Sequence, residues 1–300
     1  MDLAIWTAVA IPVMLGFAPI TQAGTTKIDS KQLDKLRGSV RLPLPDQLRE
    51  RVIVRIRSTE RLALWGAVIG LGSMALLATI LGAGDAAGPL VMLGVGVGGG
   101  IGSAIGILTA ALREDPKAQR IARSTAVEST DYVAPHTIAF ARVLLVIACL
   151  AAGLGALGTV RGEFTGRESL TFVLLPFLGA VICYAAFEIL TRLVAERAQR
   201  ATSELELAWD DVLRAHGLRQ AVTGSVVVSG ACALSVALGT ISVSATTPPW
   251  LLVSSVLLGA IGVVGGIVAM IVIMNEPAYR VLQQLWPRAD FGVGPEPRTR

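Results

Sequence analysis

Residues 250–274 read WLLVSSVLLGAIGVVGGIVAMIVIM, a run of 25 residues without a charged side chain. A helix rises about 1.5 Å per residue, so such a run is long enough to cross the hydrocarbon core of a bilayer. In hydrocarbon the backbone must satisfy its own hydrogen bonds, and the run lacks the strict alternation of a barrel strand. It therefore predicts a transmembrane helix.

The same pattern recurs along the whole chain. Of its 300 residues, 53% are hydrophobic and only 16% are charged, against about 25% charged in a typical soluble protein. The charged residues gather in blocks between the apolar stretches. These stretches are 3–23, 62–84, 89–112, 138–160, 171–192, 221–245 and 250–274. We predict an all-α, polytopic membrane protein with about seven transmembrane helices.

The first stretch resembles a secretory signal peptide only in part. Small residues precede Ala23-Gly24, but the chain begins Met1-Asp2-Leu3 without a basic region, and the run is long for a signal peptide. We interpret it as a retained helix, kinked or broken near its prolines.

Basic residues lie almost entirely on one side of the predicted membrane. The segments 24–61, 113–137, 193–220 and 275–300 together carry 22 Lys and Arg, whereas the alternate loops carry only Arg161 and Arg167. Cytoplasmic loops are enriched in basic residues. This predicts a plasma (inner) membrane protein with its N-terminus outside and its C-terminus in the cytoplasm. The chain then divides into 1–23, 24–61, 62–112, 113–137, 138–192, 193–220, 221–274 and 275–300. All but four of the 26 basic residues are arginine, which suggests a high-GC bacterial source.

The first cytoplasmic segment contains an amphipathic pattern. In 46–61, Leu48, Val52 and Ile56 form an apolar stripe flanked by arginines. This spacing predicts a short basic helix lying on the inner membrane surface, where anionic lipid attracts it.

Two further cytoplasmic helices are predicted. In 203–217, Ser203 and Glu206 have the spacing of a capping box, and Gly217 is a candidate helix end. In 277–286, the initial proline favours a helix start.

Two of the hairpins share an internal repeat. When 62–112 is shifted by about 160 residues, several glycines of this hairpin coincide with glycines of 221–274. Both hairpins start inside, so the repeat would be parallel, about the membrane normal. The predicted plan is one leading helix followed by three hairpins. The coinciding residues include Arg61 with Arg219, Gly66 with Gly224, Gly72 with Gly230, Gly102 with Gly262 and Gly106 with Gly266.

Glycines four residues apart predict close helix packing. Small residues let two helix backbones approach in lipid, where no hydrophobic drive acts between helices. The run from Gly94 to Gly106 contains a formal GxGxxG motif. This motif lies within a span and not between a strand and a helix, so dinucleotide binding is excluded. A pore lined by bare glycine backbone is the functional alternative. The glycine zipper comprises Gly94, Gly98, Gly102 and Gly106, with Gly262 and Gly266 repeating it.

Two ionisable residues fall within spans, Arg142 and Glu188. Charge in a membrane is a functional-site candidate by default, but near the cytoplasmic end of a span arginine can snorkel and glutamate can be hydrated. Each lies 23 residues from position 165, the middle of the connecting loop, so both reach similar depth on neighbouring helices. We predict an ion pair between them. The competing partner for Glu188 is Arg192, at i, i+4.

The sequence lacks the usual signatures of chemistry. Its only histidines, His136 and His216, lie in cytoplasmic segments, and it contains no HExxH, CxxC or P-loop motif. Cys149, Cys183 and Cys232 each fall in an apolar stretch and are interpreted as buried small residues. We predict no metal, no cofactor, no nucleic-acid binding and no catalytic residues.

Two short motifs carry a family resemblance. Asp131-Tyr132-Val133-Ala134-Pro135 and Trp209-Asp210-Asp211-Val212-Leu213-Arg214 resemble signatures in a family of polytopic, about seven-helix membrane proteins of high-GC bacteria. The resemblance covers the cytoplasmic segments and the helices after them. It implies an all-α membrane fold and no particular activity, and it suggests a transporter ATPase as a partner.

Three functions fit these patterns. The first is a non-enzymatic permease-like or accessory subunit of a membrane transport complex, whose cytoplasmic helices dock an ATPase or a second copy of the chain. The second is a self-contained transporter or channel for small solutes, although its spans lack the polar side chains that usually mark a substrate path. The third is a membrane-embedded enzyme acting on lipid.

Overall fold

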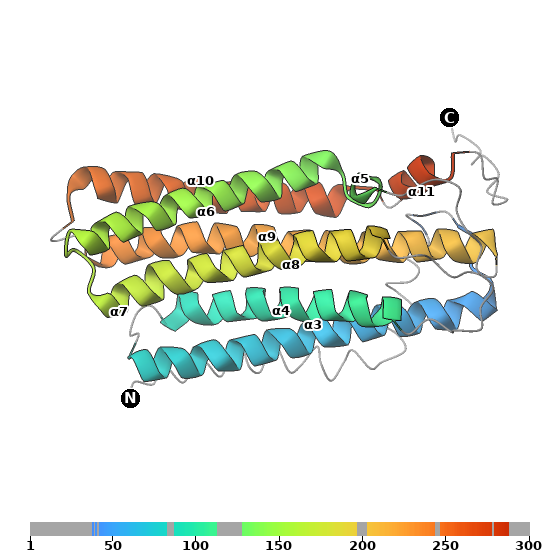
Figure 1. Cartoon of the computed structure of the whole chain (residues 1–300), viewed down its shortest axis with the longest axis horizontal. Coiled ribbons are helices and arrows are strands. Elements are labelled where there is room, and N and C mark those ends of the chain that lie inside the picture. The colour runs from blue at the N-terminus through green and yellow to red at the C-terminus, as the bar shows by residue number, and fades with distance from the viewer. Residues whose placement is uncertain are drawn as a thin grey trace.

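The computed structural model describes residues 38, 40, 42–82, 87–112, 128–196, 203–243, 247–277 and 279–287. Every secondary-structure element in these ranges is a helix (Figure 1). In chain order the helices are α3 (Asp46–Leu81), α4 (Ala87–Leu112), α5 (Ser129–Tyr132), α6 (Pro135–Val160), α7 (Gly166–Glu168), the π-helix η2 (Ser169–Leu174), α8 (Leu175–Glu196), α9 (Glu204–Ser242), α10 (Pro249–Asn275) and α11 (Tyr279–Leu285).

Six of the predicted spans correspond to apolar helices of the structure. Five helical stretches are long and apolar enough to cross a membrane, and α4 contributes a shorter apolar one, Leu93–Thr109. The predicted first helix, 3–23, lies outside the described residues. The chain is an all-α membrane protein. The five long stretches are Leu48–Leu81, Pro135–Val160, Gly166–Glu196, Glu204–Ser242 and Pro249–Asn275.

Helix α9 is the centre of the bundle. It packs against α4, α6, α8 and α10, and buried residues occur all along its length. Figure 1 shows α9 between these helices and α3 at the outer edge, beyond α4. Helix α3 packs chiefly on α4, so only a few residues of its apolar part, such as Leu71 and Ala78, are buried.

Helix α3 is longer than the sequence indicates. The predicted surface helix 46–61 and the predicted span 62–84 are one continuous helix, which begins after Pro45 and ends at Gly82. Gly82 adopts the left-handed conformation, with φ of 58°, and its N–H bonds to the carbonyls of Ala78 and Thr79. Glycine favours this conformation because it lacks a Cβ. The helix therefore extends well beyond its apolar span.

Helix α9 also continues where an end was predicted. The Ser203 side chain accepts the N–H of Glu206 at 3.2 Å, as the capping pattern indicates. Gly217, however, lies inside the helix and not at its end. A Cβ at Gly217 would lie 2.6 Å from Cγ1 of Ile107 on α4. Glycine is needed there for close approach between helices, and its role as a helix end was wrongly predicted.

The extensions of α3 and α9 pack on each other. Val52 is buried against Ala208, Trp209 and Val212, so the apolar stripe predicted to face lipid instead faces α9. Helix α11 adds Leu282 and Trp286 to the same apolar cluster. We call residues 46–61, 128–134, 204–217 and 279–286 the stalk. Its parts gather at one end of the bundle, at the right of Figure 1.

The two hairpins of the predicted repeat do not share a register. Gly102 packs against Gly66, since a Cβ on Gly66 would lie 2.9 Å from the Gly102 Cα. Gly262 instead packs against Gly230, whose carbonyl oxygen would lie 3.5 Å from its Cβ. Gly224, the predicted equivalent of Gly66, has its nearest neighbour on α4 and not on α10. Both hairpins use glycine for close packing, but their contacts are not equivalent.

The cysteines are free, and one differs from its predicted environment. Cys183 and Cys232 are buried, whereas Cys149 is exposed. It follows exposed Val146 by three residues and precedes Gly153 by four, and a Cβ on Gly153 would meet no atom within 4 Å. Cys149 therefore lies on the outer face of α6, a rotation that composition does not reveal.

Candidate functional site

The stalk contains a cluster of buried polar side chains centred on two adjacent aspartates of α9. Asp211 is 0% exposed. Its Oδ1 accepts the hydroxyl of Tyr132 at 3.0 Å, and its Oδ2 accepts the indole N–H of Trp286 at 2.9 Å. One carboxylate thus joins α9 to α5 and to the end of α11. A buried carboxylate needs such donors, because burial without them is strongly unfavourable.

Asp210 pairs with arginine side chains and not with the neutral donors that bind Asp211. It forms ion pairs with Arg55 on α3 and with Arg214 on its own helix, the latter at 2.7 Å. The Arg214 side chain is only 2% exposed, and its Nη1 donates to the carbonyl of Val194 on α8 at 3.0 Å. A second ion pair between α3 and α9 joins Arg51 and Glu206 at 2.7 Å. Removing the Asp210 carboxylate would leave the buried Arg214 with an uncompensated charge.

Burial controls the protonation of the cluster's tyrosine. Burial first, and then the nearby Asp211 carboxylate, raise the pKa of Tyr132 above its ordinary value. The hydroxyl therefore keeps its proton at neutral pH and acts as a hydrogen-bond donor. The cluster joins α3, α5, α8 and the end of α11 to α9 through neutral and charged donors, as a structural junction does.

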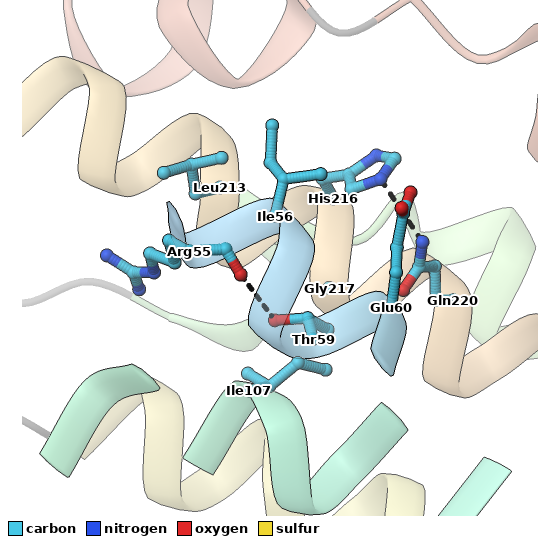
Figure 2. Close-up of a pocket in the computed structure, with 9 residues that line it drawn as sticks. All are labelled: Arg55, Ile56, Thr59, Glu60, Ile107, Leu213, His216, Gly217 and Gln220. Atoms are coloured by element: carbon cyan, nitrogen blue, oxygen red, sulfur yellow. Dashed lines mark hydrogen bonds between the residues drawn. The ribbon is translucent and has the colours of Figure 1, made fainter. Parts of the chain in front are cut away.

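A cleft lies beside this cluster, between α3 and α9, with α4 beneath it (Figure 2). His216 and Gln220 of α9 are within 3.2 Å of each other, and Ser103 of α4 donates to Gln220 at 3.3 Å. Among the described residues no group of His, Cys, Asp and Glu side chains could hold a metal ion. The cleft is lined by apolar side chains together with one positively and one negatively charged side chain. The lining residues are Arg55, Ile56, Thr59, Glu60, Ile107, Leu213, His216, Gly217 and Gln220.

The predicted glycines of α4 all face α3. A Cβ on Gly98 would overlap the carbonyl oxygen of Gly66, and one on Gly94 would overlap that of Gly70. One on Gly102 would overlap the carbonyl oxygen of Leu62. The two helices therefore meet backbone to backbone over several turns. We call Gly94, Gly98, Gly102 and Gly106, with the α3 residues they meet, the glycine seam; Gly106 faces the Thr59 Cα, 2.8 Å from its Cβ position.

On α10 only one of the two predicted glycines packs closely. A Cβ on Gly262 would lie 2.8 Å from the Ala233 Cβ of α9, but one on Gly266 would meet nothing within 4 Å. Gly259 takes the expected place of Gly266, since its Cβ would lie 2.6 Å from the Ala237 Cβ. The face of α10 that meets α9 therefore follows i, i+3 spacing here, and the packing role predicted for Gly266 is wrong.

The structure brings Arg142 and Glu188 together. Arg142 Nη2 lies 3.4 Å from Glu188 Oε1, and its Nε donates to the Tyr184 hydroxyl at 3.2 Å. The same hydroxyl donates to Glu188 at 2.6 Å. Sequence reasoning missed Tyr184, although its position one turn before Glu188 was a readable signal. Arg192, the competing partner, forms no ion pair with Glu188 in the described part of the chain.

Comparisons with known proteins add no assignment. No family model, curated protein or solved structure matches this chain. The two motifs behind the family resemblance do meet in space, because Tyr132 of the first bonds to Asp211 of the second. Sequence reasoning placed Arg55 and Trp286 in predicted cytoplasmic helices but did not pair them with the aspartates of α9, because these partners lie far away in the sequence.

Proposed function

We propose that this chain is a non-enzymatic integral membrane subunit, permease-like or accessory, of a transport complex, and that its stalk docks a partner protein. The observation that carries the proposal is the stalk itself. The long helices α3 and α9 continue past their most apolar segments as a packed unit, joined by the buried Asp210–Asp211 cluster. Such a rigid, ordered end suits a docking role, because little conformational entropy is lost there on binding.

The interior of the spans supports a subunit more than a self-contained transporter. Several buried hydroxyl groups there bond to other groups of the protein: Thr191 donates to the Phe187 carbonyl of its own helix at 2.7 Å, and Thr240 of α9 bonds to Ser255 of α10 at 2.5 Å. Substrate paths through membranes are usually lined by polar or charged groups. The cleft beside α3 is the observation that favours the second candidate, a small-solute transporter.

The distribution of arginines supports one orientation of the chain in the membrane. The stalk carries most of the arginines of the described helices, and the positive-inside rule places such an end in the cytoplasm. We propose an inner-membrane location with the stalk cytoplasmic. A cytoplasmic ATPase is then the first candidate partner, and a second copy of the chain is the alternative.

Exposed Val54 offers a site for the test. It lies on the α3 part of the stalk with 54% of its surface exposed, beside Arg51, whose side chain is 72% exposed. The change Val54→Glu should leave folding intact, because exposed substitutions rarely alter stability by more than about 0.5 kcal/mol. The matched control is Val160→Glu, at an 84% exposed position at the opposite end of the bundle.

The experiment is affinity purification of the full chain from native membranes, with quantitative mass spectrometry. We expect the wild type and Val160→Glu to retain an ATP-hydrolysing protein in fixed stoichiometry, and Val54→Glu to lose it. Retention by all three variants would exclude the α3 face of the stalk. Solute flux in liposomes containing only this chain would overturn the subunit proposal in favour of a transporter.

A further inference from the structure

Arg142 lies on the outer face of the bundle in an unusual setting. Its side chain is 64% exposed, although it stands seven residues inside α6, roughly 10 Å along the axis from the helix start. Its neighbours on this surface are exposed aliphatic side chains, Val143 and Val146 on α6 and Ile189 on α8. The guanidinium therefore emerges among side chains that face lipid.

The protein holds this guanidinium in place but satisfies only part of it. A guanidinium has five N–H donors, of which one bonds to Tyr184 and one to Glu188, leaving three. Tyr184 also donates to Glu188 at 2.6 Å, so the three side chains form a closed triangle with fixed geometry. Hydrocarbon accepts no hydrogen bonds, and donors left in it are strongly unfavourable. The remaining N–H groups need an acceptor from outside the protein.

The local charge favours an anionic acceptor. Glu188 neutralises Arg142, but Arg192 is exposed one turn farther along α8 and has no ion pair among the described residues. Counting Arg142, Glu188 and Arg192 gives a net charge of +1. Two arginines beside a surface that faces lipid match a phosphate, which the planar guanidinium binds through two parallel hydrogen bonds.

We propose that Arg142, positioned by Tyr184 and Glu188, binds the phosphate of a membrane phospholipid between α6 and α8, in the leaflet nearer the stalk. The aliphatic side chains beside it would contact the acyl chains. A lipid supplies both parts of this arrangement, whereas free phosphate supplies only the anion. The site is independent of the stalk and does not rest on the proposed docking function.

The test measures lipid binding by native mass spectrometry of the purified full chain in detergent. The added probes are phosphatidylglycerol, diacylglycerol, which lacks the phosphate, and inorganic phosphate. We expect phosphatidylglycerol alone to bind with measurable affinity. Equal binding of diacylglycerol would overturn the proposal, because apolar contacts alone would then suffice. Displacement of phosphatidylglycerol by inorganic phosphate at equal concentration would also overturn it, since the ligand would be the free anion.

Two variants separate a lipid site from a purely structural ion pair. Arg142→Gln should weaken phosphatidylglycerol binding about tenfold, the usual effect of losing a charge-assisted hydrogen bond. Glu188→Gln removes the negative charge but keeps an acceptor, so binding should be unchanged or tighter. The control Arg61→Gln removes another exposed arginine at the same end and should change binding less than about twofold.

Certain results with these two variants would contradict the proposed lipid site. Equal weakening by Arg142→Gln and Glu188→Gln, or no change with either, would overturn the proposal. If Arg142→Gln does not elute as a folded, monodisperse species, Glu188→Gln alone decides. Binding at least as tight as the wild type then supports the site, and weaker binding overturns it.

Discussion

The change Gly98→Ala tests the glycine seam most directly. A Cβ at Gly98 would overlap the Gly66 carbonyl oxygen and lie 2.9 Å from the Gly66 carbonyl carbon, where ordinary contacts begin at 3.4 Å. All of these atoms are backbone, so no side chain can rotate away. Helices α3 and α4 would have to separate by roughly 1 Å, which forfeits a quarter to a half of the dispersion energy at each contact along the seam.

Two opposing terms set the magnitude. Forcing atoms into a packed interface costs about 1–3 kcal/mol. Alanine is favoured over glycine in a helix by about 0.8–1.0 kcal/mol. The net expectation for Gly98→Ala is therefore a loss of about 0–2 kcal/mol, with a central value of about 1 kcal/mol. Gly72→Ala is the matched control, because a Cβ there meets no atom within 4 Å and only the favourable helix term remains.

The assay is thermal unfolding of the purified chain in one detergent, followed by size-exclusion chromatography of the remaining folded protein. A difference of about 2 kcal/mol between the two variants corresponds to roughly 4–8 °C in apparent Tm for a protein of this size. We expect Gly98→Ala to melt below the wild type and Gly72→Ala at or above it. Equal melting temperatures for the two variants would refute backbone contact along the seam.

Three further predictions address the stalk, α10 and the orientation. Asp210→Asn should destabilise the chain by about 3–5 kcal/mol, because it leaves buried arginine uncompensated; chemical unfolding measures this, and a loss below about 1 kcal/mol would contradict the role of the cluster. Gly262→Ala should lower the apparent Tm while Gly266→Ala should not, because only the first Cβ meets another helix; the reverse order would contradict the contacts of α10. A reporter active only outside the membrane should work when fused after Thr247 and fail after Ser203, and activity at the latter position would reverse the orientation.

The sequence predicts what the bilayer itself requires. Spans of about 20 apolar residues follow from the thickness of hydrocarbon, and the similar depth of Arg142 and Glu188 follows from equal distances to the connecting loop. Neither the hydrocarbon thickness nor the distance to a loop fixes how a helix is rotated about its own axis. Gly262 and Gly266 look alike in sequence, yet only the first meets another helix. Gly217 resembles a helix end until Ile107 of another helix is placed against it.

The same limit explains why the stalk could not be predicted. Its apolar stripe around Val52 has the composition of a helix on a membrane surface, and only tertiary structure shows that α9 covers it. The ion pair of Arg55 and Asp210 joins residues 155 positions apart. Local patterns determine which residues are helical, but here they do not determine which face of each helix packs against another helix of the chain.

Continuity of the helices connects the stalk to the membrane. Because α3 and α9 run unbroken from the stalk into their spans, a displacement of either stalk segment must be carried into the bundle. The glycine seam holds α3 to α4 along several turns, whereas α3 meets α9 chiefly at the stalk, through the Arg55–Asp210 and Arg51–Glu206 ion pairs. Helix α4 itself packs directly on α8 and α9, so a partner that separated these pairs would loosen the stalk end of α3 and leave the α3–α4 hairpin held to the bundle through α4. The proposed docking end and the glycine seam are thus joined through α3, which the ion pairs and the apolar cluster around Val52 hold to α9 at the stalk and which the seam holds to α4.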